Sequence, residues 1–171
     1  MDAEISRAEA GPVRMRDLTM ALVDIHATTG NGGEEDLRPR LVAKLPEGDP
    51  LVVLGTEGRL GQVLRNLVAN AISFSPAKGV ITLAGRRKGD RIFITVEDDG
   101  PGIPPDKLTA IFERFYSERP KGEKFGTHSG LGLSISKQIV EAYGGKLSAE
   151  NRIDASGRIM GARFVLDLIK A

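Results

Sequence analysis

Hydrophobic residues recur along this chain at two spacings, one typical of helices and one typical of strands. Between Thr56, a candidate N-cap, and Ser75 they recur every three or four positions. This predicts an amphipathic helix that buries one stripe, formed by Leu60, Val63, Leu64, Leu67 and Ala71. The same spacing predicts a helix from Met15, with Met15, Leu18, Leu22 and Ile25 on one side. It predicts a third helix after Gly130, with Leu131, Ile135, Ile139 and Ala142 on one face.

Alternating apolar and polar residues predict strands in the remaining segments. Three pairs of strands are expected, each joined by a turn: 37–45 with 51–54, 80–85 with 91–96, and 146–150 with 162–169. The expected turns are 46–50, 86–90 and a turn around 154–157. A short helix is expected over 105–112, and the chain up to residue 10 reads as the frayed end of a helix.

The order of these elements predicts the fold class. No strand–helix–strand unit repeats, so we expect a mostly antiparallel, mixed sheet with helices on one face, a two-layer α/β (α+β) sandwich. Residues 117–129 form a long polar stretch that contains glycines and has no period. A loop of this length in a compact domain is usually functional, so we expect a lid over a binding site.

Composition limits the possible functions. The chain has 171 residues, a formal net charge of +1 and no cysteine, which excludes a disulfide framework and any thiolate site. No run of basic residues is interleaved with aromatic ones, so nucleic acid is not an expected partner. No apolar stretch approaches the roughly 18 residues of a membrane span, so we expect a soluble, monomeric domain without membrane contact.

The apolar run that ends at Val96 is followed by two carboxylates and a Gly-Pro-Gly turn, residues 98–102. Glycines one residue apart let the backbone turn tightly beside a flat ligand. A carboxylate at the mouth of this turn, from Asp98, is a charged acceptor for the exocyclic amine of adenine. The alternative is an ordinary acidic surface turn.

Two further groups of residues suit a nucleotide. Asn66 and Asn70 lie one helical turn apart and offer amide oxygens, and Mg²⁺ needs only one or two protein oxygens when phosphates supply others. Gly130 and Gly132 lie at the start of the third helix, where backbone N–H groups favour phosphate. Cations lie in or near the expected lid, at Arg114, Arg119, Lys121 and Lys124. Each of these groups also has an ordinary explanation. The alternative for the asparagines is contacts at the helix edge, for the glycines a flexible helix start, and for the cations ordinary solvated charge.

These segments together resemble four motifs of bacterial sensor histidine kinases: the N box (66–71), the G1 box (98–103), the F box (112–116) and the G2 box (130–133). Residues 161–164 resemble a loose final glycine box. The resemblance covers nearly the whole chain and implies the Bergerat (GHKL) ATP-binding fold, with ATP and Mg²⁺ beneath a flexible lid and phosphoryl transfer to histidine. Residues 115–120 and 125–136 are similar to the alphaproteobacterial envelope- and acid-stress sensor kinases.

The resemblance also implies roles for particular residues. Asp98 would bind the adenine amino group, and Asn70 would ligate Mg²⁺ with help from Asn66, with Arg114 as a further catalytic residue. The other nucleotide-binding positions are Gly100, Gly102, Ile103, Phe115, Tyr116, Ser129, Gly130, Leu131, Gly132 and Leu133.

The chain departs from the family pattern at two points. Ser73 stands where a lysine is common, so one phosphate contact is in doubt. Neither His26 nor His128 has the acidic residue and the proline that follow the family's phosphoacceptor histidine. We therefore expect residues 1–11 to be the remnant of a dimerisation helix and residues 12–171 to be the catalytic domain. Its expected partners are the phosphoacceptor domain and, through the whole protein, a response regulator, in the cytoplasmic part of a membrane sensor.

Three other functions remain possible from the sequence. An ATP hydrolase of the same fold, as in the gyrase and chaperone families, carries a glutamate four residues before the second asparagine. This chain has Asn66 there, and an amide is not a base at neutral pH. The remaining alternatives are a nucleotide-binding module without catalysis and a serine kinase of the anti-sigma type.

Overall fold

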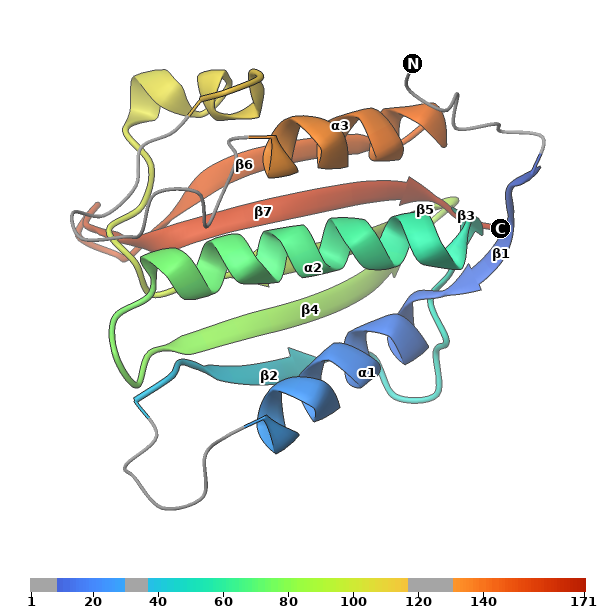
Figure 1. Ribbon diagram of the computed structural model, residues 1–171, viewed down its shortest axis with the longest axis horizontal. Helices are drawn as coiled ribbons and strands as arrows, with labels where there is room; N and C mark the ends of the chain where they lie inside the picture. Colours follow the sequence, from blue (N-terminus) through green and yellow to red (C-terminus); the bar gives the residue numbers. More distant parts are fainter. Residues whose placement is uncertain (1–8, 30–36, 117–130) are drawn as a thin grey trace.

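The computed structural model describes residues 9–29, 37–116 and 131–171. The strands are β1 (Gly11–Arg14), β2 (Arg40–Lys44), β3 (Val52–Gly55), β4 (Val80–Lys88), β5 (Arg91–Glu97), β6 (Lys146–Ile153) and β7 (Ile159–Ile169). The helices are α1 (Met15–Thr28), α2 (Glu57–Phe74) and α3 (Gly132–Ala142), with two 3₁₀ turns, η2 (Pro105–Lys107) and η3 (Ala110–Phe112). The three α-helices lie side by side on one face of the sheet, as Figure 1 shows.

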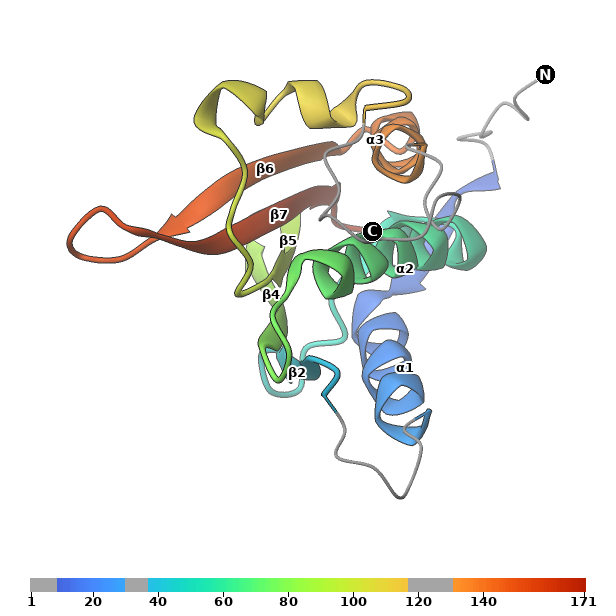
Figure 2. The same cartoon turned by 60° about the vertical axis from the view of Figure 1, so that its left-hand side comes forward.

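The main sheet has five strands in the order β2-β4-β5-β7-β6. Only β2 and β4 are parallel, and the other neighbours are antiparallel. A second, two-stranded sheet joins β1 to β3. The β6–β7 hairpin extends beyond the helices (Figure 2). This architecture confirms the predicted two-layer sandwich with a mostly antiparallel, mixed sheet.

The hydrophobic core lies between the sheet and α2. All five residues of the predicted stripe on α2 are buried. Opposite them, β5 buries every second residue, Ile92, Ile94 and Val96. Side chains two apart on a strand point to the same face. Asp98, the next position in this row after β5 ends, is therefore directed toward the helices and the core.

The predicted apolar faces of α1 and α3 need correction. Ile25 of α1 is 59% exposed. Leu131 precedes α3, and this helix buries Ser134 and Ser136 together with Ile139 and Val140. The hydroxyl of Ser136 accepts a hydrogen bond from the side-chain nitrogen of Asn66, 3.2 Å away, which compensates for its burial.

Two predictions about the strands and one about a helix were wrong in detail, and one strand was missed. The missed strand is β1, which is held by pairing with β3. β2 and β3 do not form a hairpin, because β2 pairs with β4 and β3 with β1. The turn between β4 and β5 comprises only residues 89 and 90. Residues 105–112 form η2 and η3 rather than one short helix.

Thr56 precedes α2 as predicted, but its side chain does not cap the helix. Its hydroxyl instead lies 2.8 Å from the hydroxyl of Tyr143, at the end of α3. Tyr143 is fully buried, and a buried phenol usually requires a hydrogen-bond partner. This contact ties the beginning of α2 to the end of α3.

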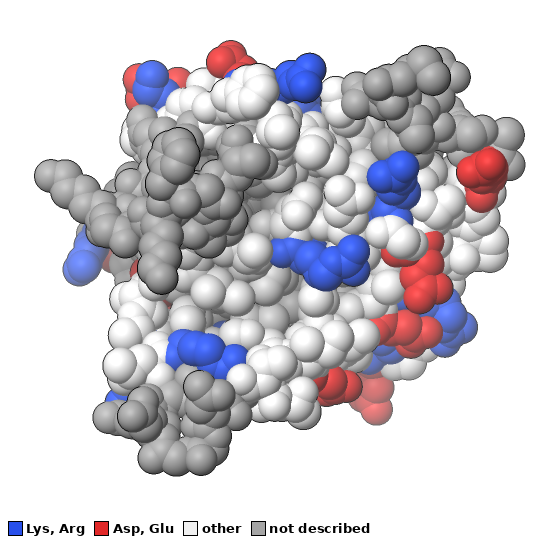
Figure 3. All heavy atoms as spheres, viewed as in Figure 1, with Lys and Arg blue, Asp and Glu red and all other residues white. Residues whose placement is uncertain are grey.

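Two expectations cannot be compared with the structure. The expected lid and most of the expected N-terminal helix remnant lie outside the described residues. Within the described residues, no helix has the length and apolar character needed to cross a membrane. On the face viewed in Figure 3, the Lys and Arg side chains of the described residues are scattered rather than gathered in one band.

Candidate active site

A pocket opens between the end of α2, the residues after β5 and the first turn of α3. Its volume is about 580 Å³, including space open to solvent. Most of its wall is apolar, and its polar groups are the side chains of Asp98 and Asn70 and the hydroxyl of Tyr116. The lining residues are Asn70, Phe74, Asp98, Gly102, Ile103, Pro104, Ile111, Tyr116, Leu133, Ala162 and Phe164.

Asp98 is held rigidly in the wall of this pocket and is only 3% exposed. Its Oδ1 accepts hydrogen bonds from the backbone N–H of Gly100 (2.8 Å) and of Ala162 (3.1 Å). Among the described residues, none donates a hydrogen bond to its other oxygen, Oδ2. Burial raises the pKa of the Asp98 carboxyl above its ordinary value, although the two N–H donors and Arg152 act in the opposite direction. The pocket thus offers one fixed carboxylate oxygen to a ligand.

The turn after Asp98 packs tightly against its neighbours. A Cβ atom on Gly100 would lie 2.7 Å from the carbonyl oxygen of Phe74. Gly102 has a positive φ of 80°, and a Cβ there would lie 2.8 Å from Oδ1 of Asn151. Both glycines are therefore needed for close approach of the backbone, and Gly102 is also needed for its conformation. Gly102 and Ile103 line the pocket, and Gly100 does not.

The two asparagines of α2 have different surroundings. Asn70 lines the pocket. Asn66 instead donates hydrogen bonds from Nδ2 to the carbonyl oxygen of Gly132 (3.3 Å) and to the hydroxyl of Ser136 (3.2 Å). Asn66 therefore holds α2 against the start of α3. The described residues contain no group of three or more acidic or histidine side chains that would bind a metal ion by themselves.

The remaining predicted site residues are divided between the pocket and its surroundings. Tyr116 and Leu133 line the pocket. Phe115 is 70% exposed, has a positive φ of 64° and contacts the guanidinium of Arg114, whose Cζ is 5.9 Å from the ring centroid. Leu131 and Gly132 lie beside the pocket at the start of α3. Ser129 and Gly130 lie outside the described residues.

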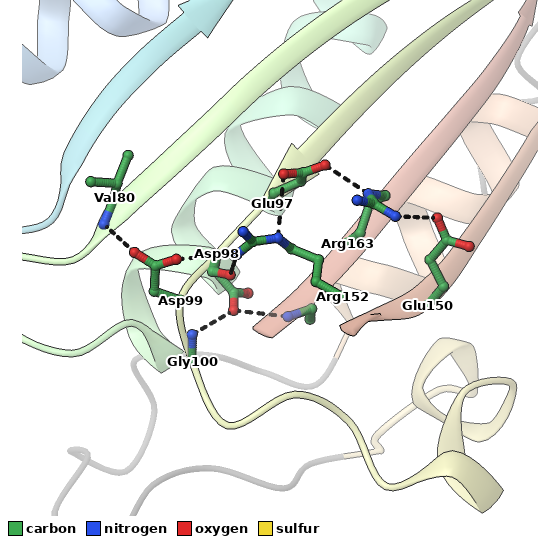
Figure 4. A network of polar contacts seen from close by, with 9 residues as sticks. Val80, Glu97, Asp98, Asp99, Gly100, Glu150, Arg152 and Arg163 are labelled. Carbon is green, nitrogen blue, oxygen red and sulfur yellow. Dashed lines mark hydrogen bonds and ion pairs between the residues drawn. The ribbon is translucent and has the colours of Figure 1, made fainter. Parts of the chain in front are cut away.

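Sequence reasoning missed a set of residues on β6 and β7 that surround Asp98 (Figure 4). Arg152 donates from Nη1 to the backbone carbonyl of Asp98 (2.7 Å) and to Oδ1 of Asp99 (3.1 Å). Arg163 on β7 donates hydrogen bonds to Glu97 on β5 and to Glu150 on β6, the two neighbouring strands. The spacing of apolar and polar residues along β6 and β7 does not distinguish Arg152 and Arg163 from ordinary surface residues. The sequence alone therefore does not assign them to the site.

The comparisons with known proteins identify the family. Residues 55–170 match the profile of the "Histidine kinase-, DNA gyrase B-, and HSP90-like ATPase" family. The chain belongs to this family. It is therefore an ATP-binding domain, as the four motifs predicted.

Its relatives are sensor histidine kinases. The sensor protein ChvG of Agrobacterium fabrum is 46% identical over 98% of this chain, and the chain spans 28% of ChvG. The catalytic domain of the histidine kinase ThkA superposes with a TM-score of 0.76 and 25% identity, covering 95% of this chain and 96% of that one. Full-length ShkA, solved in complex with AMPPNP, superposes with a TM-score of 0.70 and 25% identity, covering 95% of this chain and 32% of that one.

These matches confirm that the chain is the catalytic domain of a sensor histidine kinase, as the four motifs predicted. The match to ChvG also supports the narrower resemblance to the alphaproteobacterial stress sensor kinases.

Proposed function

We propose that this domain transfers the γ-phosphoryl group of Mg-ATP to a histidine on a separate dimerisation and phosphoacceptor domain. The observation that carries the proposal is the buried Asp98 carboxylate, which is fixed by two backbone N–H groups and lines a mostly apolar pocket. A carboxylate in an apolar pocket is a strong acceptor for the adenine amino group. The solved complex of the relative ShkA with AMPPNP supports a nucleotide as the ligand.

Asn70 fits a Mg²⁺ ion that is held mainly by phosphate. Its side chain lines the same pocket as Asp98, and the described residues offer no acidic cluster that would bind the ion alone. Mg²⁺ commonly keeps one or two protein oxygens beside phosphate and water, and when bound it would neutralise the phosphate charge. Asn70 would supply one such oxygen. Asn66 is already engaged with α3, so its contribution would be mainly to hold that helix in place.

Phosphoryl transfer depends largely on positioning and charge stabilisation. A nitrogen of the acceptor histidine forms the bond to the γ-phosphorus as the bond to the bridging oxygen breaks, which leaves ADP. His26 is not suited to this role, because its Nε2 is 2.7 Å from the carbonyl oxygen of Pro39, with which it forms a hydrogen bond. The acceptor is therefore assigned to another domain of the parent protein, consistent with the greater length of its relatives.

The wider setting follows from the same relatives. We propose that the parent protein is a membrane-anchored sensor whose catalytic domain lies in the cytoplasm. We propose further that its phosphoacceptor domain passes the phosphoryl group to a response regulator. The hydrolase alternative is less favoured, since Asn66 stands where the hydrolases carry a glutamate base and its amide is occupied by two hydrogen bonds.

The test is a phosphorylation assay with radiolabelled ATP, Mg²⁺ and the helical hairpin of the parent protein as a separate fragment. We expect acid-labile label on the hairpin, and none on the chain alone. The reaction in trans should be slow and depend on concentration, because the two fragments are not tethered. Asn70→Ala should abolish the transfer, whereas Gln62→Ala, two turns earlier on α2 and outside the pocket, should leave it unchanged.

Two results would contradict the proposal. Label on the chain alone would indicate that a residue of this chain accepts the phosphoryl group, with His26 and His128 as the candidates. Label on the hairpin that survives acid would indicate a serine or threonine kinase.

A further inference from the structure

We infer that Asn151 and Arg152, two neighbouring residues of β6, are positioning residues that hold both ends of the adenine-binding turn, residues 98–103. The inference rests on the proposed adenine contact of Asp98. Adjacent residues of a strand point to opposite faces of the sheet. One of the two side chains can therefore reach the turn from the helix side and the other from the open side.

Asn151 holds the end of the turn. Its Oδ1 accepts a hydrogen bond from the backbone N–H of Ile103 (2.8 Å), and its Nδ2 donates to the carbonyl oxygen of Ile103 (2.7 Å). One side chain thus satisfies both backbone groups of a residue that lines the pocket, as a neighbouring strand would. The same Oδ1 lies where a side chain on Gly102 would have to go, so the contact depends on the glycine.

Arg152 holds the beginning of the turn. Its Nη1 lies 2.7 Å from the carbonyl oxygen of Asp98 and 3.1 Å from Oδ1 of Asp99. Its Nε forms an ion pair with Glu97 at 3.4 Å. The three consecutive acidic residues 97–99 would repel one another without this guanidinium, and Arg152 is positioned to stabilise all three (Figure 4).

The strand itself brings the two side chains to the turn. Asn151 pairs with Ala162, whose N–H bonds to Asp98, so β6 lies one strand away from the adenine carboxylate. The register of β6 on β7 shifts between Arg152 and Ile153. Such irregularities commonly redirect side chains next to active sites. Neither residue touches the pocket itself, so each would act through the backbone of the turn.

The test measures nucleotide affinity by calorimetry and local exchange by NMR on the same variants. Asn151→Ala should weaken ATP and ADP by the same factor, about tenfold, because both nucleotides share the adenine end. The backbone N–H of Ile103 should exchange faster in this variant, while the amides of β5 and β7 keep their protection. Ser148→Ala, three residues earlier on β6 and outside the pocket lining, is the matched control and should change neither quantity.

Two more variants define the contribution of each end. Asn151→Asp keeps an acceptor for the Ile103 N–H but places a carboxylate oxygen against the Ile103 carbonyl oxygen, so its affinity should fall at least as far as that of Asn151→Ala. Arg152→Gln should weaken ATP by a similar factor and move the acid limb of binding to higher pH, since Asp98 then lacks its nearest cation. The other charged groups near Asp98 are Asp99 and Glu97, with Arg163 paired to Glu97.

A purely structural role would lower the urea midpoint of unfolding and leave the affinity of the folded chain unchanged. Affinities of Asn151→Ala and Asn151→Asp within twofold of the wild type would therefore overturn the inference. Asp98→Asn separates this result from a failure of the proposed function. If Asp98→Asn binds ATP normally, the adenine contact is refuted; if it loses ATP while the Asn151 variants bind normally, only the positioning role fails.

Discussion

The backbone of Gly161 passes so close to Asp98 that a Cβ atom at position 161 would overlap the carbonyl oxygen of Asp98. Gly161 has a φ of 152°, a conformation that other residues rarely adopt. The next residue, Ala162, exchanges two hydrogen bonds with Asp98, accepting from its N–H and donating to Oδ1. The absence of a side chain at position 161 is therefore required for this placement of Asp98.

Gly161→Ala should damage nucleotide binding more than an ordinary turn substitution does. Relief of the overlap must displace the backbone of Asp98, at a cost of about 1–3 kcal/mol in unfolding free energy. We expect ATP affinity to fall by more than about tenfold. Gly157→Ala is the control, because Gly157 also has a positive φ (87°) but has open space around it. It should lose stability with unchanged affinity, and equal affinities of the two variants would contradict the argument.

Asp98→Asn should make the chain more stable in the absence of nucleotide. The asparagine keeps an Oδ1 that accepts from Gly100 and Ala162, but it removes a buried charge. The thermal midpoint at neutral pH should rise by about 2–4 °C, as is common when a functional group is removed from a binding site. A lower midpoint for Asp98→Asn would show that the charge stabilises the fold.

The pH dependence of this difference has a definite sign. Burial raises the pKa of Asp98 in the folded chain above its unfolded value. Its favourable contribution is therefore present at pH values below the unfolded pKa and is lost as the pH rises through the folded pKa. The stability advantage of Asp98→Asn should disappear in acid and grow toward neutral pH. Urea unfolding of both proteins across this range measures it.

The affinity of the wild type for ATP should fall as the pH is lowered, whereas its stability relative to Asp98→Asn should rise. The adenine amine requires the deprotonated carboxylate as its acceptor, so ATP affinity should decline in acid, beginning above the pH at which an exposed aspartate titrates. Calorimetry between neutral pH and the acid limit of stability checks this. In Asp98→Asn the weaker residual binding should lack this step, and a step of the same size would assign it to another group.

The Thr56–Tyr143 contact should stabilise the chain without affecting the pocket. Tyr143→Phe should cost about 1 kcal/mol of unfolding free energy, since it leaves the Thr56 hydroxyl without this partner. Thr56→Val in the Tyr143→Phe background should cost less than it does alone, which a double-mutant cycle measures. Strict additivity would show that the two hydroxyls do not interact.

Sequence patterns predicted those parts of the fold that local periodicity determines. The α2 stripe and the β4–β5 and β6–β7 hairpins follow from side-chain spacing, and Asp98 follows from its place after an apolar strand. β1 was missed because four residues that include Gly11 and Pro12 have no local preference for a strand. Its pairing with β3 supplies the stabilisation, and that pairing joins segments about 40 residues apart.

The errors at the site arise from tertiary hydrogen bonds. Ser136 is polar and was not among the residues of the predicted apolar face of α3, but its hydroxyl bonds Asn66 and it is fully buried. Asn151 and Arg152 also appear to be surface residues. Their importance depends on contacts with residues 98, 99 and 103, about 50 positions away, and no spacing within β6 reveals such contacts.

The small β1–β3 sheet also brings the two ends of the described domain together. β3 pairs with β1 along one edge, and Val53 bridges to Lys170 while the N–H of Ala171 bonds to Val52. Strand spacing then separates Gly11–Arg14 from the last residues by about 10 Å. A short linker would span this distance, so the domain should tolerate circular permutation, with new ends in the exposed turn at residues 154–157. In such a permutant β7 would become the first strand along the chain and β6 the last.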